Sequence, residues 1–108
     1  MPYYLFNSCI KKKLGELSDI CITLGLQESK CKDGVREWDM KSPSDLIYLI
    51  NYDPHRRMPI VLQTKPTINH KDKRVRELMR QIMAVSGSTE VYHGWWNGKK
   101  IDIKGEYL

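Results

Sequence analysis

The sequence predicts an α/β domain in which a small mixed sheet is flanked by helices and ends in a C-terminal β-hairpin. Two apolar runs, residues 46–50 and 59–62, are short and rich in β-branched side chains, as buried strands are. Two longer segments repeat apolar residues every three or four positions, as amphipathic helices do. Near the C-terminus, Asn97-Gly98 separates two further runs, which is the strongest short signal for a hairpin.

Length and composition indicate one globular domain with net positive charge. The chain has 108 residues, which predicts a single domain spanning 1–108 with one modest core. Lysine and arginine together number 18 against 13 acidic residues, which gives a net charge of +5 and a pI near 9.2. This charge favours an anionic partner, with nucleic acid first and an acidic protein surface as the alternative.

The cysteines and the apolar runs bear on where the protein works. Cys9, Cys21 and Cys31 are odd in number and form no CxxC pair, so neither a structural zinc site nor a disulfide framework is expected. No apolar run approaches the roughly 20 residues that cross a bilayer. The N-terminal apolar run is too short for a secretory signal. We therefore expect a cytoplasmic protein without a membrane partner, acting in the producing cell or in a host cell.

The first part of the chain is predicted to contain a helix, a loop and a strand. The helix starts near Asn7 or Ser8 and ends at Gly25. Residues 27–34 are polar and are expected to form a loop. Val35–Met40 alternates apolar and polar residues, as a half-buried strand does. The apolar stripe of the helix consists of Ile10, Leu14, Leu17, Cys21 and Leu24.

Residues 42–50 admit two interpretations. Ser42 and Pro43 form a good helix start, with an acid in the first turn. The run 46–50 has no helical polar face, however, and contains two isoleucines and a tyrosine, so we favour a strand. After a turn built on Asp53-Pro54, residues 59–64 form the next strand, and Pro66 helps to end it.

A second helix and the hairpin complete the predicted fold. The helix begins at Asn69 or Asp72 and ends at Ser86-Gly87. Its apolar stripe consists of Val75, Leu78, Met79, Ile82 and Met83. A two-residue turn at Asn97-Gly98 would pair His93 with Asp102. Alternation then directs Tyr92, Trp96, Ile101 and Ile103 toward the core and leaves Val91, His93, Trp95, Lys100 and Asp102 on the other face.

Asp45, Gln63 and Lys65 form the candidate catalytic constellation. A hairpin between the two apolar runs would bring Asp45 beside Gln63 and Lys65, which share one face of their strand. Phosphodiester hydrolysis uses a divalent cation to polarise the phosphoryl oxygen, and oxygen ligands hold such cations. A lysine beside the metal can orient the attacking water or offset the developing charge.

The order of these elements resembles the PD-(D/E)xK nuclease superfamily, especially its small virus-type replication-repair nucleases. Pro43-Ser44-Asp45 stands for the Pro-Asp element with one residue inserted, and Gln63-Thr64-Lys65 stands for the acid-x-Lys element with Gln replacing the acid. The resemblance covers residues 16–96. It implies a metal-dependent endonuclease in which Asp45 and Gln63 hold Mg²⁺ or Mn²⁺, and in which Glu16, or Glu37 as a substitute, supplies a further acid.

Basic and aromatic residues of the C-terminal half are candidates for contact with nucleic acid. A basic helix face can line phosphates, and an exposed indole beside a lysine can stack on a base. An exposed indole can equally anchor a protein partner. The candidate contacts are Lys71, Lys73, Arg74, Arg76, Arg80, Trp95 and Lys100.

The histidines offer a different chemistry. His55, His70 and His93 can do the acid–base work of a metal-free ribonuclease, because histidine titrates near neutral pH. They lie in three separate segments, and the sequence alone does not bring them together. The leading expectation is therefore a nucleic-acid-acting, nuclease-like protein, and the alternative is a non-enzymatic inhibitor or adaptor. A homodimer would be natural for a nuclease this small, although nothing in the sequence requires one.

Overall fold

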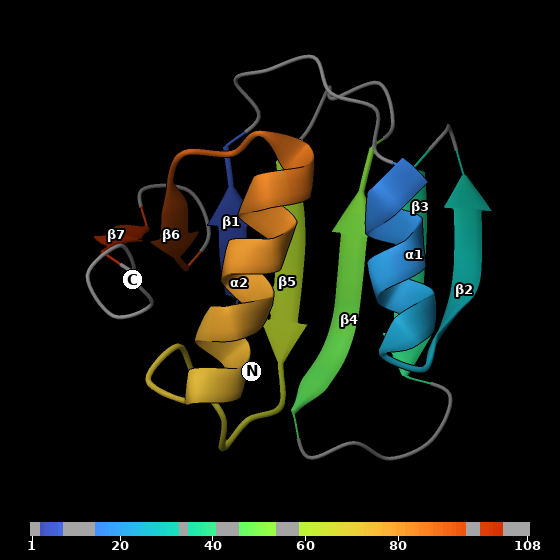
Figure 1. Cartoon of the computed structure of the whole chain (residues 1–108). Helices are drawn as coiled ribbons and strands as arrows, with labels where there is room; N and C mark the ends of the chain where they lie inside the picture. Colours follow the sequence, from blue (N-terminus) through green and yellow to red (C-terminus); the bar gives the residue numbers. More distant parts are fainter. Residues whose placement is uncertain are drawn as a thin grey trace.

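In the computed structural model, two helices lie against a sheet of seven strands within the part of the chain that is described (Figure 1). The structure describes residues 3–7, 15–32, 35–40, 46–53, 59–94 and 98–102. In chain order the elements are β1 (Tyr3–Phe6), α1 (Gly15–Thr23), β2 (Leu26–Lys32), β3 (Val35–Met40), β4 (Ile47–Tyr52), β5 (Ile60–Thr64), α2 (Lys73–Ser86), β6 (Val91–His93) and β7 (Lys99–Ile101).

Every pair of neighbouring strands is antiparallel, so the expectation of a mixed sheet is wrong. The strand order is β2-β3-β4-β5-β1-β6-β7. Strands β5 and β6 point the same way and are joined through α2, as in a β-α-β unit. Strand β1 lies between them and runs antiparallel to both. In this split β-α-β arrangement, β5 and β6 each pair with β1, and so they do not form a parallel pair with each other.

Both helices cover the same face of the sheet. Figure 1 shows α2 in front of β1 and β5, and α1 in front of β3 and β4. The two helices and the facing side chains of the strands share one apolar cluster. Alternation places Tyr4, Ile50 and Leu62 on this helix-covered face and Leu5, Val61 and Gln63 on the opposite face, which we call the open face.

Helix α2 matches the predicted helix closely. The Asp72 side chain accepts a hydrogen bond from the backbone N–H of Arg74 at 2.8 Å and so caps its first turn. Gly87 ends the helix with a φ of 72°, a left-handed conformation that suits glycine. Of the predicted stripe, Val75, Leu78, Met79 and Ile82 are buried, and Met83 packs against the core.

Helix α1 is confirmed in its second half. Leu17 and Cys21 are fully buried, and Leu24 packs against the core. Burial raises the pKa of the Cys21 thiol to about 12, so this cysteine behaves as a small apolar side chain. The expected start at Ser8, with Ile10 and Leu14 of the stripe, lies outside the described residues. Asn7 is used differently, because its amide oxygen accepts hydrogen bonds from the N–H groups of residues 89 and 90 at 2.9 and 2.7 Å.

Two strands were not predicted, and the loop expected at residues 27–34 is wrong for residues 27–32, which belong to β2, while residues 33–34 lie outside the described residues. Strand β2 is an edge strand and pairs on one side only, so it tolerates a polar sequence. Its Leu26 is buried, and Glu28 forms an ion pair with Arg36 of β3 at 2.9 Å. Strand β1 is short, but Tyr4 and Phe6 are fully buried and hold it in the middle of the sheet.

The strand interpretation of the first apolar run is confirmed. Ile47–Tyr52 forms β4, which pairs with β5 in an antiparallel hairpin. Val35–Met40 forms β3, as its alternation predicts. The helix expected for a start at Ser42 is therefore absent from residues 47–52, while residues 41–45 lie outside the described part of the chain.

The C-terminal hairpin forms, but its predicted register and the predicted faces of its first strand are wrong. His93 pairs with Lys99 and Val91 pairs with Ile101, so the turn is longer than two residues and His93 does not pair with Asp102. Val91 also pairs with Phe6 and is fully buried, which directs Val91 and His93 to the helix-covered face and Tyr92 to the open face. Ile101 packs against the core as expected. The predictions for Trp95, Trp96 and Ile103 lie outside the described residues.

In the described ranges, no helix is both long and apolar enough to cross a bilayer.

Candidate functional site

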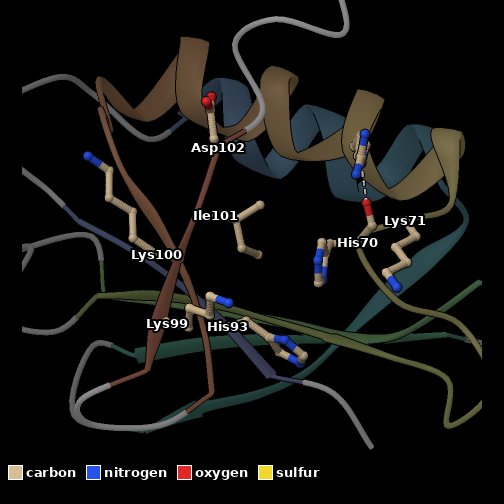
Figure 2. A pocket seen from close by; sticks show the side chains of 8 residues that line it. His70, Lys71, His93, Lys99, Lys100, Ile101 and Asp102 are labelled. Atoms are coloured by element: carbon tan, nitrogen blue, oxygen red, sulfur yellow. Dashed lines mark hydrogen bonds between the residues drawn. The ribbon is translucent and has the colours of Figure 1, made fainter.

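A basic pocket opens on the helix-covered face, between the turn that precedes α2 and the β6–β7 hairpin (Figure 2). Its volume is about 400 Å³, which is large enough for a phosphate with its sugar. The described residues that line it are His70, Lys71, Arg76, His93, Lys99, Lys100, Ile101 and Asp102.

The sheet places one histidine and one lysine at this pocket. His93 on β6 pairs with Tyr4 on one side and with Lys99 on the other. Residues directly opposite in paired strands point to the same face, so Tyr4, His93 and Lys99 form one row. Tyr4 and its neighbour Leu62 are fully buried, which fixes this row on the side of the helices. The position of His93 therefore depends on the central strand β1.

The turn before α2 places the second histidine. The backbone N–H of His70 donates to the Tyr4 hydroxyl at 2.8 Å, and the same hydroxyl lies 3.4 Å from His70 Nδ1. Asn69 accepts a hydrogen bond from the N–H of Lys71 at 2.9 Å, which closes the turn. The guanidinium of Arg76, on the first turns of α2, donates to the carbonyl oxygen of His70 (Figure 2). Three contacts thus hold this turn against the sheet and the helix.

Three aromatic rings meet at the base of the pocket. Tyr4 and His93 are stacked, with ring centroids 4.8 Å apart and an interplanar angle of 18°. His70 meets Tyr4 edge-on at 5.8 Å and meets His93 edge-on at 5.1 Å. We call these three residues the Tyr4–His70–His93 cluster. Its two imidazoles lie close enough that protonation of one opposes protonation of the other.

The charge around the cluster is mainly positive. Lys71 and Lys99 lie on either side of the two histidines in Figure 2. Burial, followed by the charges of His93, Arg76 and Lys71, lowers the pKa of His70 below its ordinary value. His70 is therefore neutral at pH 7. Burial also raises the pKa of Tyr4, partly offset by its hydrogen bond with the His70 backbone, so Tyr4 keeps its proton.

Lys100 contributes less charge to the pocket than its position suggests. Adjacent residues of a strand point to opposite faces, and Lys100 pairs with Tyr92 on the open face. Its amine forms an ion pair with Glu90 at 3.0 Å, and this pairing raises the pKa of Lys100 and lowers that of Glu90. In Figure 2 the Lys100 side chain extends away from the histidines.

The residues predicted to contact nucleic acid are not all at the pocket. Lys71, Arg76 and Lys100 line it. Arg74 and Arg80 lie along α2, where they are paired with Asp72 at 3.1 Å and with Glu77 at 3.6 Å. Lys73 is exposed on the same helix, and Trp95 lies outside the described residues. The pocket also contains His70, His93 and Lys99, which were not expected to converge with them.

The predicted metal constellation is described only in part. Gln63 is 3% exposed and lies on the open face in a row with Tyr3 and Leu49. Lys65 lies one residue beyond the end of β5, and its amine lies 5.1 Å from the centre of the Tyr48 ring. The N–H of Lys65 donates to the carbonyl of Leu46 at 3.0 Å. Asp45 directly precedes Leu46 in the chain and lies outside the described residues.

The further acids expected at that site are not brought to Gln63. Glu16 belongs to α1, which covers the face of the sheet opposite to Gln63. Glu37 lies on the open face, but two strands away from Gln63, where it accepts hydrogen bonds from Asn51 at 3.5 Å and Ser29 at 3.4 Å. Within the described ranges, no group of three or more His, Cys, Asp or Glu side chains is arranged to hold a metal ion.

Comparison with protein-family models, with curated proteins and with solved structures finds no match to this chain. The resemblance to the PD-(D/E)xK superfamily therefore stays a hypothesis that depends on Asp45, Gln63 and Lys65.

Proposed function

We propose that this protein binds the phosphodiester backbone of nucleic acid, with one phosphate in the pocket between α2 and the β6–β7 hairpin. The observation that carries this proposal is the convergence of two histidines, three lysines and an arginine around one cavity of about 400 Å³. Asp102 is the one acid among the described lining residues. Such a site attracts an anion and repels a cation.

The protonation of His70 favours the same ligand. Burial and the neighbouring positive charges oppose its protonation. A bound phosphate brings negative charge beside the ring and would reverse part of that effect. Because a neutral ligand would offer no such compensation, an anion is the ligand that this environment stabilises best.

The surroundings suit a chain of phosphates better than a single free ion. Lys73, Arg74 and Arg80 continue the positive charge along the polar side of α2, away from the pocket. The ion pairs of Arg74 and Arg80 are exposed, so these two side chains can exchange a carboxylate for a phosphate at little cost. A nucleic-acid strand along this face would release counterions and bind with strong salt dependence.

Two adjacent lysines provide a sharp test of the binding site. Binding of a fluorescein-labelled single-stranded RNA and DNA is measured by anisotropy over a range of salt concentrations. Lys99→Ala is expected to weaken binding of every sequence and to reduce the slope of log K against log salt by about 1. Lys100→Ala removes the same charge from the next residue, whose amine is paired with Glu90 and extends away from the histidines, so its slope should change less than that of Lys99→Ala. Equal effects of the two variants, or no binding at all, would contradict the proposal.

A second candidate function is metal-dependent hydrolysis at Gln63 and Lys65. The hydrogen bond from Lys65 to Leu46 favours it, because the residue before Leu46 is Asp45. Oxygen ligands at this end of the sheet would suit Mg²⁺ or Mn²⁺. Supercoiled, single-stranded and branched DNA are incubated with either metal. Cleavage that Lys65→Ala and EDTA both abolish supports this function, and metal-independent binding without cleavage rejects it.

A further inference from the structure

We propose that the His70–His93 pair cleaves RNA without a metal, by transferring the phosphodiester to the neighbouring 2′-oxygen. This inference rests on the proposed function, because the pocket must first hold a phosphate. It extends that function from binding to a reaction and names RNA as the substrate class.

The two histidine rings lie close enough together to act on the same phosphodiester, one as base and the other as acid. The two imidazole centroids are 5.1 Å apart, and both rings line one pocket. At this separation a proton on one ring opposes a proton on the other. One neutral and one protonated imidazole are the combination that a base and an acid need in the same site.

Burial decides which ring has which role. The lowered pKa of His70 keeps this ring neutral at neutral pH, which suits a general base. His93 stacks on Tyr4 and lies in a row with Lys99 at the turn end of the hairpin. Its ring then supplies the proton as general acid. The contacts of the His70 backbone with Tyr4 and Arg76 hold the base in position without occupying its Nε2 atom.

The reaction balances with these two residues alone. His70 takes the proton from the 2′-hydroxyl, and the 2′-oxygen forms a bond to phosphorus. The bond between phosphorus and the 5′-oxygen breaks, and His93 donates a proton to that oxygen. The products are a 2′,3′-cyclic phosphate and a 5′-hydroxyl, and a later proton exchange with water restores the pair. No atom is oxidised or reduced, and no further reactant is needed.

The cations of the pocket have a separate part in this reaction. Negative charge grows on the non-bridging oxygens of the phosphate as the 2′-oxygen attacks. Lys71 and Lys99, on either side of the histidines in Figure 2, would be placed to stabilise that charge. DNA lacks the 2′-hydroxyl and is therefore expected to bind without being cleaved.

The test separates cleavage from binding. Labelled RNA is incubated with the protein in excess EDTA, and the ends of the products are analysed by mass spectrometry. A 2′-O-methyl RNA of the same sequence reports binding alone, because its blocked oxygen is not a nucleophile. His70→Gln and His93→Gln are each expected to slow cleavage at least about 100-fold. Their affinities for the 2′-O-methyl RNA should change only a few-fold. Gln81→Ala, on the exposed side of α2, is the control expected to behave like the unaltered protein.

The pH profile adds a reading that a purely structural histidine would not give. Cleavage is expected to follow a bell-shaped curve, and each histidine variant should lose one limb of it. Other charged and titratable groups face the pair and would affect this profile. They are Tyr4 of β1, Lys71 of the turn before α2, Arg76 of α2, Lys99 of β7 and Asp102 directly after β7.

The possible negative results distinguish a failure of the cleavage proposal from a failure of the proposed binding function. If the 2′-O-methyl RNA binds but RNA is not cut in EDTA, the cleavage proposal is overturned and the binding function stands. If neither RNA binds, the proposed function itself fails. Cleavage that EDTA abolishes, or that survives both histidine substitutions in the same preparation, would also overturn the role of this pair.

Discussion

His70 shows how one side chain couples the fold to pH. Its pKa is lowered mainly by burial, and then by the charges of His93, Arg76 and Lys71. In the unfolded chain the ring is exposed and takes up a proton as the pH falls below about 6.5. The unfolded state therefore binds protons before the folded state does, and protonation favours unfolding in this range.

The resulting prediction concerns the stability of the folded protein. The contribution of neutral His70 is fully present above pH 6.5 and is lost as the pH falls through the lowered pKa of the folded state. Urea unfolding at pH 7.5 and 5.5 should show a larger loss of stability for the unaltered protein than for His70→Gln. Saturating inorganic phosphate should reduce that loss, because a bound anion favours the protonated ring. An identical pH dependence in both proteins would contradict the argument.

A hydrogen bond between Ser18 of α1 and Tyr52 of β4 helps to attach the helix to the sheet, and it gives a second prediction at this scale. The hydroxyls of Ser18 and Tyr52 are 2.6 Å apart, and Tyr52 is 1% exposed. Tyr52→Phe should lower the free energy of unfolding by about 1 kcal/mol. Ser18→Ala leaves a buried hydroxyl without this partner and should cost about 1–3 kcal/mol. The double variant tests the pairing, because its cost should be smaller than the sum of the two single costs.

Among the secondary-structure elements, the β6–β7 hairpin determines the geometry of the pocket. Gly98 lies against the backbone of the opposite strand, and a Cβ atom there would be only 2.6 Å from the carbonyl oxygen of His93 and 3.0 Å from that of Gly94. Both are backbone atoms, so relief of such a clash must move the strand that carries His93. The close approach of this hairpin is therefore coupled to the position of the histidine.

Glycine substitutions at the hairpin and at the end of α2 make a matched pair of variants. Gly98→Ala is expected to cost about 1–3 kcal/mol in stability and also to weaken RNA binding at conditions where the protein stays folded. Gly87→Ala at the end of α2 should cost about 1–2 kcal/mol through its left-handed backbone, without loss of binding. Urea unfolding and anisotropy measure the two effects. Equal losses of binding would show that instability alone, and not the hairpin geometry, affects the site.

The elements that the sequence predicts well are those whose signals are local. Helix α2 has a capping aspartate, an apolar stripe and a terminal glycine, and all three are found where expected. The hairpin was misplaced because the Asn97-Gly98 signal favours a two-residue turn, whereas the pairing of Val91 with Phe6 sets the faces. That pairing joins residues 85 positions apart, and no local pattern reports it.

The same dependence on long-range pairing explains which parts of the candidate site could be predicted from the sequence. The face that Gln63 and Lys65 are expected to share follows from alternation, and it stays a prediction because Lys65 lies one residue beyond β5. The convergence of His70 with His93 was not predictable, because both residues are placed by Tyr4. Strand β1 is absent from the predicted elements, because the N-terminal apolar run was considered only as a secretory signal, although four consecutive apolar residues also suit a short buried strand. When the first strand of a sheet lies between two later strands, as β1 does, the residues that meet at the site are far apart in the sequence and no local pattern predicts that they meet.

At the scale of the whole molecule, β1 joins two parts of the sheet that have no other pairing between them. Tyr4 and Phe6 are fully buried, and β1 is the strand to which both β5 and β6 are hydrogen-bonded. Phe6→Ala is expected to lower the free energy of unfolding by about 3–5 kcal/mol, a large share of the 5–15 kcal/mol typical of a small domain. Tyr3→Ala, on the open face of the same strand, should cost clearly less, because Tyr3 is only partly buried.

Removal of residues 1–6 should have a qualitatively different effect from either substitution. Without β1, strands β5 and β6 lose their shared partner, and their parallel direction prevents them from simply closing the gap in the antiparallel pattern. We expect the truncated chain to lose cooperative urea unfolding and the near-ultraviolet circular dichroism of its packed aromatic side chains. A synthetic peptide of residues 1–7 should restore both signals if β1 acts by insertion. A truncated chain that unfolds cooperatively without the peptide would show that the two parts of the sheet form a stable structure independently of β1.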